Sequence, residues 1–229
     1  MKEEVLACNK LLRLIGDSGL DEDMVRVYEA MKEAGLRPTI ITFSTLISRA
    51  GSCRKLHLAE RFYGEMLAMG IRPDVQAMNS LINACAKAGK PRRAMEAFEE
   101  MPSFGLSPSI VTFNSLIDAC ARAGDITGAR SAFERVAEWG LIPNQRTFST
   151  LIHSHAKRGQ VDEAFEVLEQ MRKLGLDPNR VTYSALINAC GRAGQLEKAF
   201  VTLGDMIRGG IEPNVITWTT LIDACGKKK

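Results

Sequence analysis

Small, uncharged polar side chains recur in this 229-residue chain with a period of 35 residues. We call this set the polar column, and its members are Asn9, Ser44, Asn79, Asn114, Ser149, Ser184 and Thr219. Each lies in the body of an expected helix, where Asn, Ser and Thr are less favourable than Ala or Leu. A helix face that only met water would be expected to contain Glu, Lys or Gln as well. We therefore predict that the polar column forms hydrogen bonds with a ligand.

Positive charge recurs at a second position with the same period. The cation column consists of Lys87, Arg122, Lys157, Arg192 and Lys227, after Asp17 and Ser52 at the two earlier positions. The formal net charge of +3 is too small to indicate a nucleic-acid binder by itself. Any one of these cations alone would be interpreted as solvated surface charge, but five in register favour an anionic polymer as the ligand. The N-terminal end is expected to hold that polymer less tightly.

A third column is mainly aliphatic. This aliphatic column consists of Leu6, Ile41, Gln76, Val111, Arg146, Val181 and Ile216. Its apolar members are suited to wedge between successive bases of a nucleic acid. Arg146 departs from the pattern but can stack through its guanidinium plane, whereas Gln76 puts the fit at its repeat in doubt.

A fourth column stands just after a proline and just before an expected helix. This closing column consists of Thr39, Asp74, Ser109, Asn144, Asn179 and Asn214. All of these residues are good helix N-caps, and capping alone explains their chemistry.

We find no constellation of catalytic or metal-binding residues in the sequence. Of the three histidines, His57, His153 and His155, the second recurs with polar and charged residues from Arg13 to Asp223, at a position distinct from the polar column. It is expected to line a groove or meet water. The deaminase signature, the Walker loop and the G-x-S-x-G elbow are absent. The six cysteines contain no C-x-x-C pair, and four of them share one column, which indicates buried, reduced thiols. We therefore predict no enzymatic activity and no cofactor.

The elements that position these columns follow from the same period. Pro38, Pro73, Pro108, Pro143, Pro178 and Pro213 lie 35 residues apart, and a glycine precedes each by three. We predict repeats at 5–39, 40–74, 75–109, 110–144, 145–179 and 180–214, with a partial repeat at 215–229. Each repeat contains two helices that bury their apolar faces by stacking, which predicts an α-solenoid without strands. No apolar run approaches the ~18 residues of a membrane span.

Details of the repeats predict the helix ends. The first helices are expected to end near Gly89, Gly124, Gly159 and Gly194. In the third repeat the second helix is expected from about Arg92 to Phe104, with Gly105 as a left-handed cap. In the second repeat, Gly51 appears as a displaced inter-helix glycine. The chain stops one helix into a seventh repeat, so we expect a piece of a longer array that can associate end to end.

The repeated motifs resemble those of the pentatricopeptide repeat (PPR) family. They are V-T-F-N-S-L-I, then A-G-x-x-x-x-A, then E-M-x-x-x-G-[LI]-x-P, and their uniform 35-residue length resembles the P-type subclass. Tetratricopeptide repeats have a period of about 34 residues and a W-x₂-L-G-x₂-Y signature that is missing here. The resemblance implies an all-α, right-handed α-solenoid of tandem helix-turn-helix repeats. It also implies single-stranded RNA as the partner, with no membrane, and location in a chloroplast or mitochondrion.

The resemblance further implies that a polar-column residue and the next closing-column residue together read one base. Asn9 with Thr39 resembles a weak pyrimidine reader, and Ser44 with Asp74 a guanine reader. Asn79 with Ser109 resembles a cytosine reader, and Asn114 with Asn144 a general pyrimidine reader. Ser149 with Asn179 and Ser184 with Asn214 resemble adenine readers, whereas Thr219 has no closing partner. The expected preference is near 5′-YGCYAA-3′, with the aliphatic column between bases and the cation column on phosphates.

A protein-binding scaffold is the competing hypothesis. Many tetratricopeptide arrays act in this way, and their groove residues are expected to vary with the partner peptide. The restriction of the polar column to Asn, Ser and Thr favours RNA. A further alternative is that this stretch mainly spaces or dimerises a longer protein.

Overall fold

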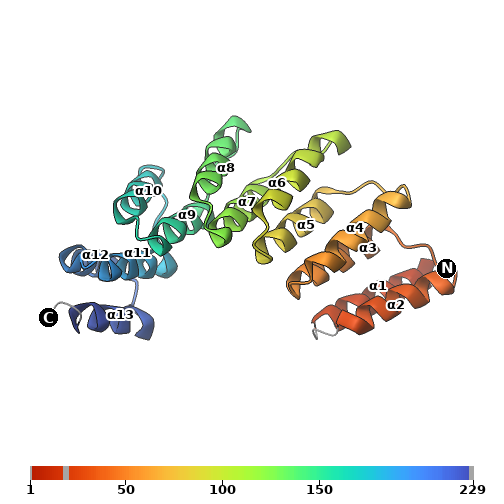
Figure 1. Ribbon diagram of the computed structural model, residues 1–229, viewed down its shortest axis with the longest axis horizontal. Coiled ribbons are helices and arrows are strands. Elements are labelled where there is room, and N and C mark those ends of the chain that lie inside the picture. The colour runs from red at the N-terminus through yellow and green to blue at the C-terminus, as the bar shows by residue number, and fades with distance from the viewer. Residues whose placement is uncertain (1, 18–20, 227–229) are drawn as a thin grey trace. The chain divides into compact units, whose positions relative to one another are not determined.

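The computed structural model of the chain describes residues 2–17 and 21–226. These residues form thirteen α-helices and one short 3₁₀ helix, without a strand (Figure 1). The chain divides into two compact units, residues 1–123 and residues 124–229, and each is described by itself. No helix in the described ranges is long and apolar enough to cross a membrane.

Unit 1 is a row of helix pairs. Its helices are α1 (Lys2–Asp17), α2 (Asp21–Glu33), α3 (Ile40–Ser52), α4 (Leu56–Ala68), α5 (Val75–Lys87), α6 (Pro91–Glu100), the 3₁₀ helix η1 (Met101–Phe104) and α7 (Ile110–Ala123). Helix α1 packs on α2, α3 on α4 and α5 on α6. The first helices of successive pairs also pack on one another, in the order α1, α3, α5 and α7.

Unit 2 repeats this arrangement. Its helices are α8 (Ile126–Glu138), α9 (Gln145–Lys157), α10 (Val161–Lys173), α11 (Arg180–Arg192), α12 (Leu196–Arg208) and α13 (Val215–Gly226). Helix α9 packs on α10 and α11 on α12, while α9, α11 and α13 form the row of first helices. The predicted repeat boundaries remain a prediction, because the helices alone do not fix where one repeat ends.

Side-chain caps explain why the first helices begin where they do. The carboxylate of Asp74 accepts a hydrogen bond from the backbone N–H of Ala77 at 2.7 Å, and Asn144 caps α9 in the same way at 3.1 Å. These bonds satisfy N–H groups that have no partner within the helix. The capping role predicted for the closing column is therefore present at Asp74, Asn144, Asn179 and Asn214.

The second helix of the third repeat ends differently from the prediction. It is α-helical only to Glu100, and Met101–Phe104 form a 3₁₀ turn. Pro102 has no N–H to donate, so the α-helical bonding pattern cannot continue through it. Gly105 then takes the expected left-handed conformation at φ 73°.

Gly51 has a different role from the one that the sequence suggested. It lies inside α3, and a Cβ atom added there would stand 2.8 Å from Cβ of Ala84 in α5. The glycine therefore permits close packing of two first helices. Arg54 instead occupies the left-handed position after α3, at φ 59°, where the next repeat has Gly89.

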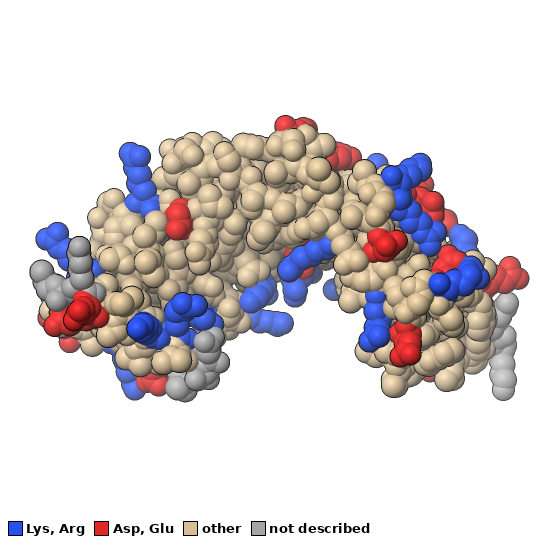
Figure 2. Space-filling view, turned by 180° about the vertical axis from the view of Figure 1, so that it is seen from behind, with Lys and Arg blue, Asp and Glu red and all other residues tan. Residues whose placement is uncertain are grey.

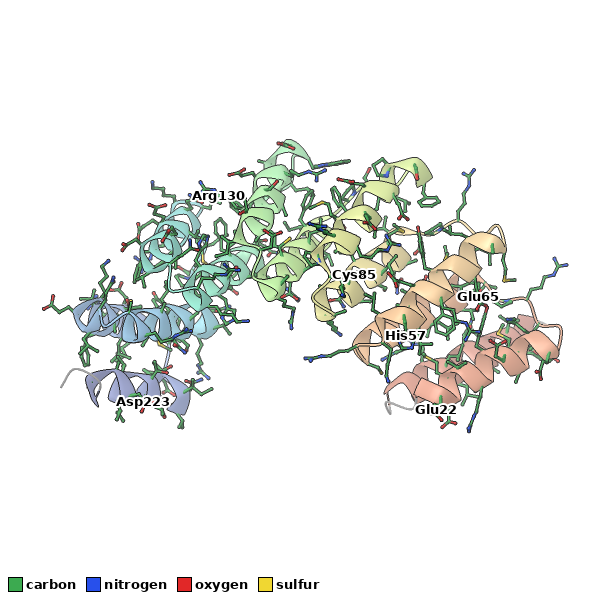
Figure 3. All side chains as sticks on the ribbon, in the orientation of Figure 1. Glu22, His57, Glu65, Cys85, Arg130 and Asp223 are labelled. Carbon is green, nitrogen blue, oxygen red and sulfur yellow. The ribbon has the colours of Figure 1, made fainter. Side chains whose placement is uncertain are left out.

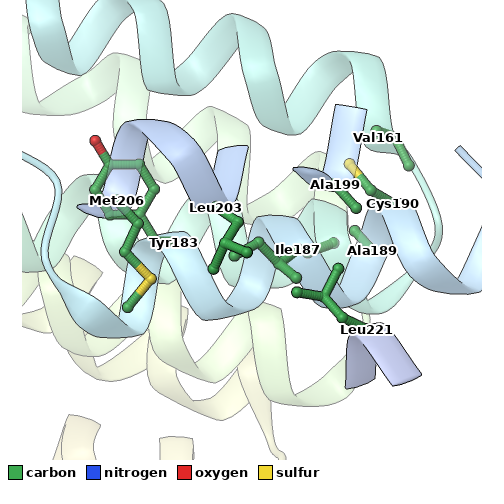
Figure 4. Packing of buried hydrophobic residues seen from close by; sticks show 10 residues of the cluster. Val161, Tyr183, Ile187, Ala189, Cys190, Ala199, Leu203, Met206 and Leu221 are labelled. Carbon is green, nitrogen blue, oxygen red and sulfur yellow. The ribbon is translucent and has the colours of Figure 1, made fainter. Parts of the chain in front are cut away.

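Each unit has a core between its helix pairs. Figure 4 shows the cluster of unit 2, in which Ile187, Leu203, Met206 and Leu221 pack together. Two cysteines of the shared column, Cys85 in unit 1 (Figure 3) and Cys190 in unit 2, are fully buried, as predicted. Burial raises the pKa of Cys85 to about 12 and that of Cys190 to about 11. Cys225, in α13, is exposed.

Candidate nucleic-acid interface

The aliphatic column lies on the surface of the first helices. Leu6, Ile41, Val111, Val181 and Ile216 are between 54% and 66% exposed, and Gln76 and Arg146 are exposed as well. Five large apolar side chains in one register contribute little to the cores, so the fold does not explain them. Single exposed apolar residues are ordinary, but a periodic set marks a surface that contacts something else.

The polar column is more enclosed than we expected. We predicted that these side chains would line an open groove, but Asn114 and Ser149 are only 5% and 8% exposed. For Ser149 the reason is its place where α9 packs on α11 in unit 2. In unit 2 the Ser149 hydroxyl lies 2.8 Å from that of Thr182 in α11. Four members of the column, Asn9, Ser44, Asn114 and Ser149, are thus buried and expose only a small part of the side chain.

Two surface cavities of unit 1 bring predicted pairs together with the aliphatic column. The first, of about 520 Å³, is lined by Asn9, Thr39, Leu6 and Ile41 among others. One predicted polar pair and two members of the aliphatic column therefore line the same cavity.

The second cavity surrounds the predicted guanine reader. It has a volume of about 430 Å³, and Ser44, Asp74, Ile41 and Gln76 contribute to its lining. Arg13 and Arg49 line the same cavity, and the sequence argument missed both as candidate ligand contacts. Their signal was weak, because neither position holds a cation in the later repeats. Unit 1 therefore has positive charge beside this pair despite the neutral Ser52 in the cation column.

The closing column lies at the helix starts and is more accessible than the polar column. Thr39 and Asn144 are exposed, and Asp74, Ser109, Asn179 and Asn214 are half-buried. Thr219, the unpaired member of the polar column, is exposed, and its hydroxyl donates to the carbonyl of Val215 within α13. Asn79 and Ser184 are half-buried.

A set of buried threonines joins the two columns, and the sequence argument did not single them out. This threonine column consists of Thr42, Ala77, Thr112, Thr147, Thr182 and Thr217, with alanine at one position. Thr182 Oγ1 lies 2.8 Å from Ser149 Oγ and 3.1 Å from Asn179 Oδ1. The clue was available, since a β-branched, polar residue at a fully buried helix position is unfavourable without a hydrogen-bond partner.

The cation column is present but uneven. Lys87 is half-buried at the end of α5, and Lys157 and Arg192 are exposed in unit 2. Arg122 Nε donates to Asp118 Oδ2 at 2.8 Å, so this cation already has an acidic neighbour one turn earlier. An exposed ion pair of this kind is weak and can yield to a phosphate. Lys227 lies outside the described residues. Figure 2 shows Lys and Arg side chains interspersed with Asp and Glu on one face.

The histidines have no arrangement suited to catalysis. His57, labelled in Figure 3, and His153 are exposed, and His155 Nδ1 lies 3.2 Å from Gln160 Oε1. In the parts of the chain that the structure describes, no group of His, Cys, Asp or Glu is placed to hold a metal ion.

Comparison with protein families gives three matches. Residues 61–224 match the pentacotripeptide-repeat region of PRORP. Residues 1–52 match the pentatricopeptide repeat domain, and residues 41–71 match the PPR repeat. Comparison with curated protein sequences gives no significant match.

Solved structures resemble the chain over most of its length. The pentatricopeptide repeat protein PPR10 from maize is 32% identical, with a TM-score of 0.73, over 93% of this chain and 31% of that one. PPR10 in complex with an 18-nt psaJ RNA element has a TM-score of 0.80 at 27% identity, over 96% of this chain and 32% of that one. This chain thus spans about a third of PPR10. The predicted all-α helical repeat array is confirmed.

A second group of solved structures shares the fold alone. The PPR domain of Arabidopsis thaliana protein-only RNase P 1 (PRORP1), in complex with tRNA, is 15% identical with a TM-score of 0.66. That match covers 79% of this chain and 95% of the other.

Proposed function

Because the chain belongs to the pentatricopeptide repeat family, we propose that it binds single-stranded RNA selectively, with about one base per repeat. The observation that carries this proposal is the first cavity of unit 1. There Asn9 and Thr39, which carry hydrogen-bonding groups, line the same cavity as the exposed side chains of Leu6 and Ile41. A base held in this way is stacked on both faces and contacted at its edge, which is how proteins read unpaired RNA.

The base order follows from the pairs within the proposed repeats 5–39 to 180–214. We propose a preference near 5′-YGCYAA-3′, read from the N-terminal repeat toward the 3′ end of the RNA. The second base is guanine because Asp74 accepts hydrogen bonds, and guanine carries donors on its Watson–Crick edge. The cation column and the arginines of the second cavity would contact the phosphates.

A binding assay with paired RNAs tests the proposal. The RNA 5′-YGCYAA-3′ is compared with a version that carries adenine in place of guanine at its second base, at about 150 mM salt. We expect the guanine RNA to bind at least several-fold more tightly, because adenine offers Asp74 only one donor. Equal affinity would remove the assignment of Ser44 and Asp74. Failure of every oligoribonucleotide to bind would remove the function itself.

Salt dependence separates this function from peptide binding. Five phosphate contacts on a single strand give a log–log slope of about −3.5, at about 0.7 per contact. A protein-binding scaffold would show no salt-dependent binding to RNA, so it would not retain RNA homopolymers on a filter.

We propose that these residues bind RNA without chemistry of their own, on transcripts of a chloroplast or mitochondrion. Occupied nucleotides would block an exonuclease, remodel a hairpin or mark a processing site. The fold does not fix the compartment, because solved structures that share it include nuclear PRORP2 from A. thaliana. Localisation of the tagged full-length protein tests this part.

We also propose that copies of this chain associate end to end. Helix α13 exposes Trp218 and Ile222, which gives it an apolar face. Sedimentation at rising protein concentration should show association that Trp218→Lys weakens. A monomer at all concentrations would contradict it.

A further inference from the structure

We propose that the threonine column determines which hydrogen-bonding group each base-reading pair presents to its base. The inference rests on the proposed RNA binding and adds positioning residues to it. Thr182 and Thr217 would fix two pairs for adenine, and the alanine at position 77 would leave one pair suited to guanine.

Thr182 links the two members of one pair. It is fully buried in α11, with Ser149 of α9 on one side and the closing residue Asn179 on the other. Its hydroxyl oxygen lies 2.8 Å from Ser149 Oγ and 3.1 Å from Asn179 Oδ1. The three polar groups therefore form one continuous chain of hydrogen bonds.

The backbone fixes the direction of the amide. The N–H of Thr182 donates to Asn179 Oδ1 at 3.0 Å, and a backbone N–H can only donate. The amide oxygen of Asn179 must therefore face the helix start, where it also accepts the Thr182 hydroxyl proton. Its NH₂ group remains available, so Asn179 presents donors to a ligand.

The direction of the serine hydroxyl follows in turn. Thr182 has one proton, which it donates to Asn179. Ser149 must then donate its own proton to Thr182 Oγ1, which leaves the lone pairs of Ser149 as acceptors. The pair thus presents one acceptor and one donor group.

This order of groups matches adenine and opposes guanine. The Watson–Crick edge of adenine carries the N6 amino donor beside the N1 acceptor, which suits Ser149 and Asn179 respectively. Guanine carries an O6 acceptor beside an N1–H donor, so each contact would meet a group of the same kind. Cytosine presents its amino donor and ring-nitrogen acceptor in the same order as adenine, but it is a smaller base. Discrimination against cytosine must therefore come from the distance between the Ser149 hydroxyl and the Asn179 amino group.

The next pair in unit 2 has the same arrangement. Thr217 Oγ1 lies 3.0 Å from Ser184 Oγ and donates to Asn214 Oδ1 at 2.9 Å. The backbone N–H of Thr217 also donates to that amide oxygen at 2.9 Å. In unit 1, Thr112 donates to Asn79 Oδ1 at 2.6 Å, which likewise leaves the Asn79 amino group available.

The guanine reader departs from this arrangement where the threonine is missing. Ala77 has no hydroxyl, and the buried Ser44 Oγ makes no hydrogen bond among the described residues. The Ser44 proton is therefore not committed to a threonine, and because its oxygen is enclosed in the free protein, the hydroxyl has to turn toward the cavity to donate to guanine O6. One oxygen of Asp74 caps Ala77, and its carboxylate can still accept from guanine N1–H and its amino group. The absence of one hydroxyl thus reverses the role of the serine.

The substitution Thr182→Val tests the inference, because it removes the hydroxyl and keeps the shape. Binding is measured to RNAs with adenine or guanine at the fifth base of 5′-YGCYAA-3′. We expect the adenine-to-guanine ratio of affinities to fall about five-fold at that base, as for the loss of one hydrogen bond. The ratio at the sixth base should stay unchanged, and Thr182→Ser should restore the ratio at the fifth.

Thr150→Val is the matched control, because the Thr150 hydroxyl donates to the carbonyl of Arg146 within α9 and touches no base-reading pair. It should leave both ratios unchanged. If Thr182→Val unfolds the chain, Ala77→Thr provides the opposite test and should lower the guanine-to-adenine ratio at the second base about five-fold.

The outcomes separate the two proposals. If the wild-type chain binds RNA and prefers adenine at the fifth base, but Thr182→Val keeps the full ratio, the threonine inference is overturned and RNA binding stands. An unchanged second-base ratio in Ala77→Thr overturns it equally. If the wild-type chain binds no RNA, the proposed function fails, and the inference fails with it.

Discussion

The exposed aliphatic column offers the sharpest test of RNA binding, and Val181 is its best member. Val181→Ala removes two methyl groups, each worth about 0.8 kcal/mol when fully buried. Since the side chain is 61% exposed in the free protein, bases can bury only that share, which gives about 1 kcal/mol. The RNA dissociation constant should therefore rise about five-fold.

The same substitution should leave the stability of the protein nearly unchanged. The part of Val181 already buried is worth about 0.6 kcal/mol, and the higher helix propensity of alanine offsets most of it. Val201→Ala is the matched control, because Val201 is 63% exposed but lies on α12, a second helix. The assay is fluorescence anisotropy with labelled RNA, beside thermal unfolding of each variant.

Two results would refute this reasoning. One is an affinity for RNA within two-fold of the wild type in Val181→Ala, and the other is an equal loss in Val201→Ala. The loss should also be similar for any base at the neighbouring positions, because stacking on an aliphatic side chain is tolerant of sequence.

Three further predictions concern stability and charge. Gly51→Ala should lower the free energy of unfolding by about 1–3 kcal/mol, because the added Cβ would overlap a neighbouring helix. Gly64→Ala has open space around it and should raise the free energy of unfolding by about 0.5–1 kcal/mol. Urea unfolding measures both changes. Burial raises the pKa of Glu65, but hydrogen bonds, including one from Tyr28, outweigh it and hold that pKa below the ordinary 4.5. The stability that this carboxylate contributes is thus fully present above pH 4.5 and is lost as the pH falls through the lowered pKa of the folded state. Tyr28→Phe should make this acid-induced loss of stability smaller. Measuring the free energy of unfolding at several pH values checks the prediction. Lys157→Gln should reduce the magnitude of the log–log salt slope of RNA binding by about 0.7. An unchanged slope would show that Lys157 does not contact a phosphate.

The sequence predicted the helices well because the period repeats the same caps and stops. Asp74 and Asn144 cap helices as their types required, and Gly105 ends the second helix with a left-handed residue. Gly51 was misjudged because a glycine can serve a turn or a close helix contact. Only the distance to the neighbouring helix distinguishes these roles.

The roles of the candidate site residues remain predictions, and the sequence did not show how deeply these residues are buried. A column shows which residues share an environment, and Leu6 and Asn9, from two different columns, line one cavity in the structure. It could not show that Ser149 would be nearly enclosed, because that depends on how closely α9 and α11 approach. It also gave no partner for Thr182, since a hydrogen bond between residues 33 positions apart requires the packed structure.

The buried thiols have a practical consequence. Cys85 belongs to unit 1 and Cys190 to unit 2, and their raised pKa values keep both protonated near neutral pH. Only the thiolate reacts quickly with alkylating reagents, so these two sulfurs are shielded twice, by protonation and by enclosure. Their modification rates, resolved by peptide mass spectrometry, would report how often each half of the array opens. The two native thiols would therefore measure the opening of the two units independently, without an added label.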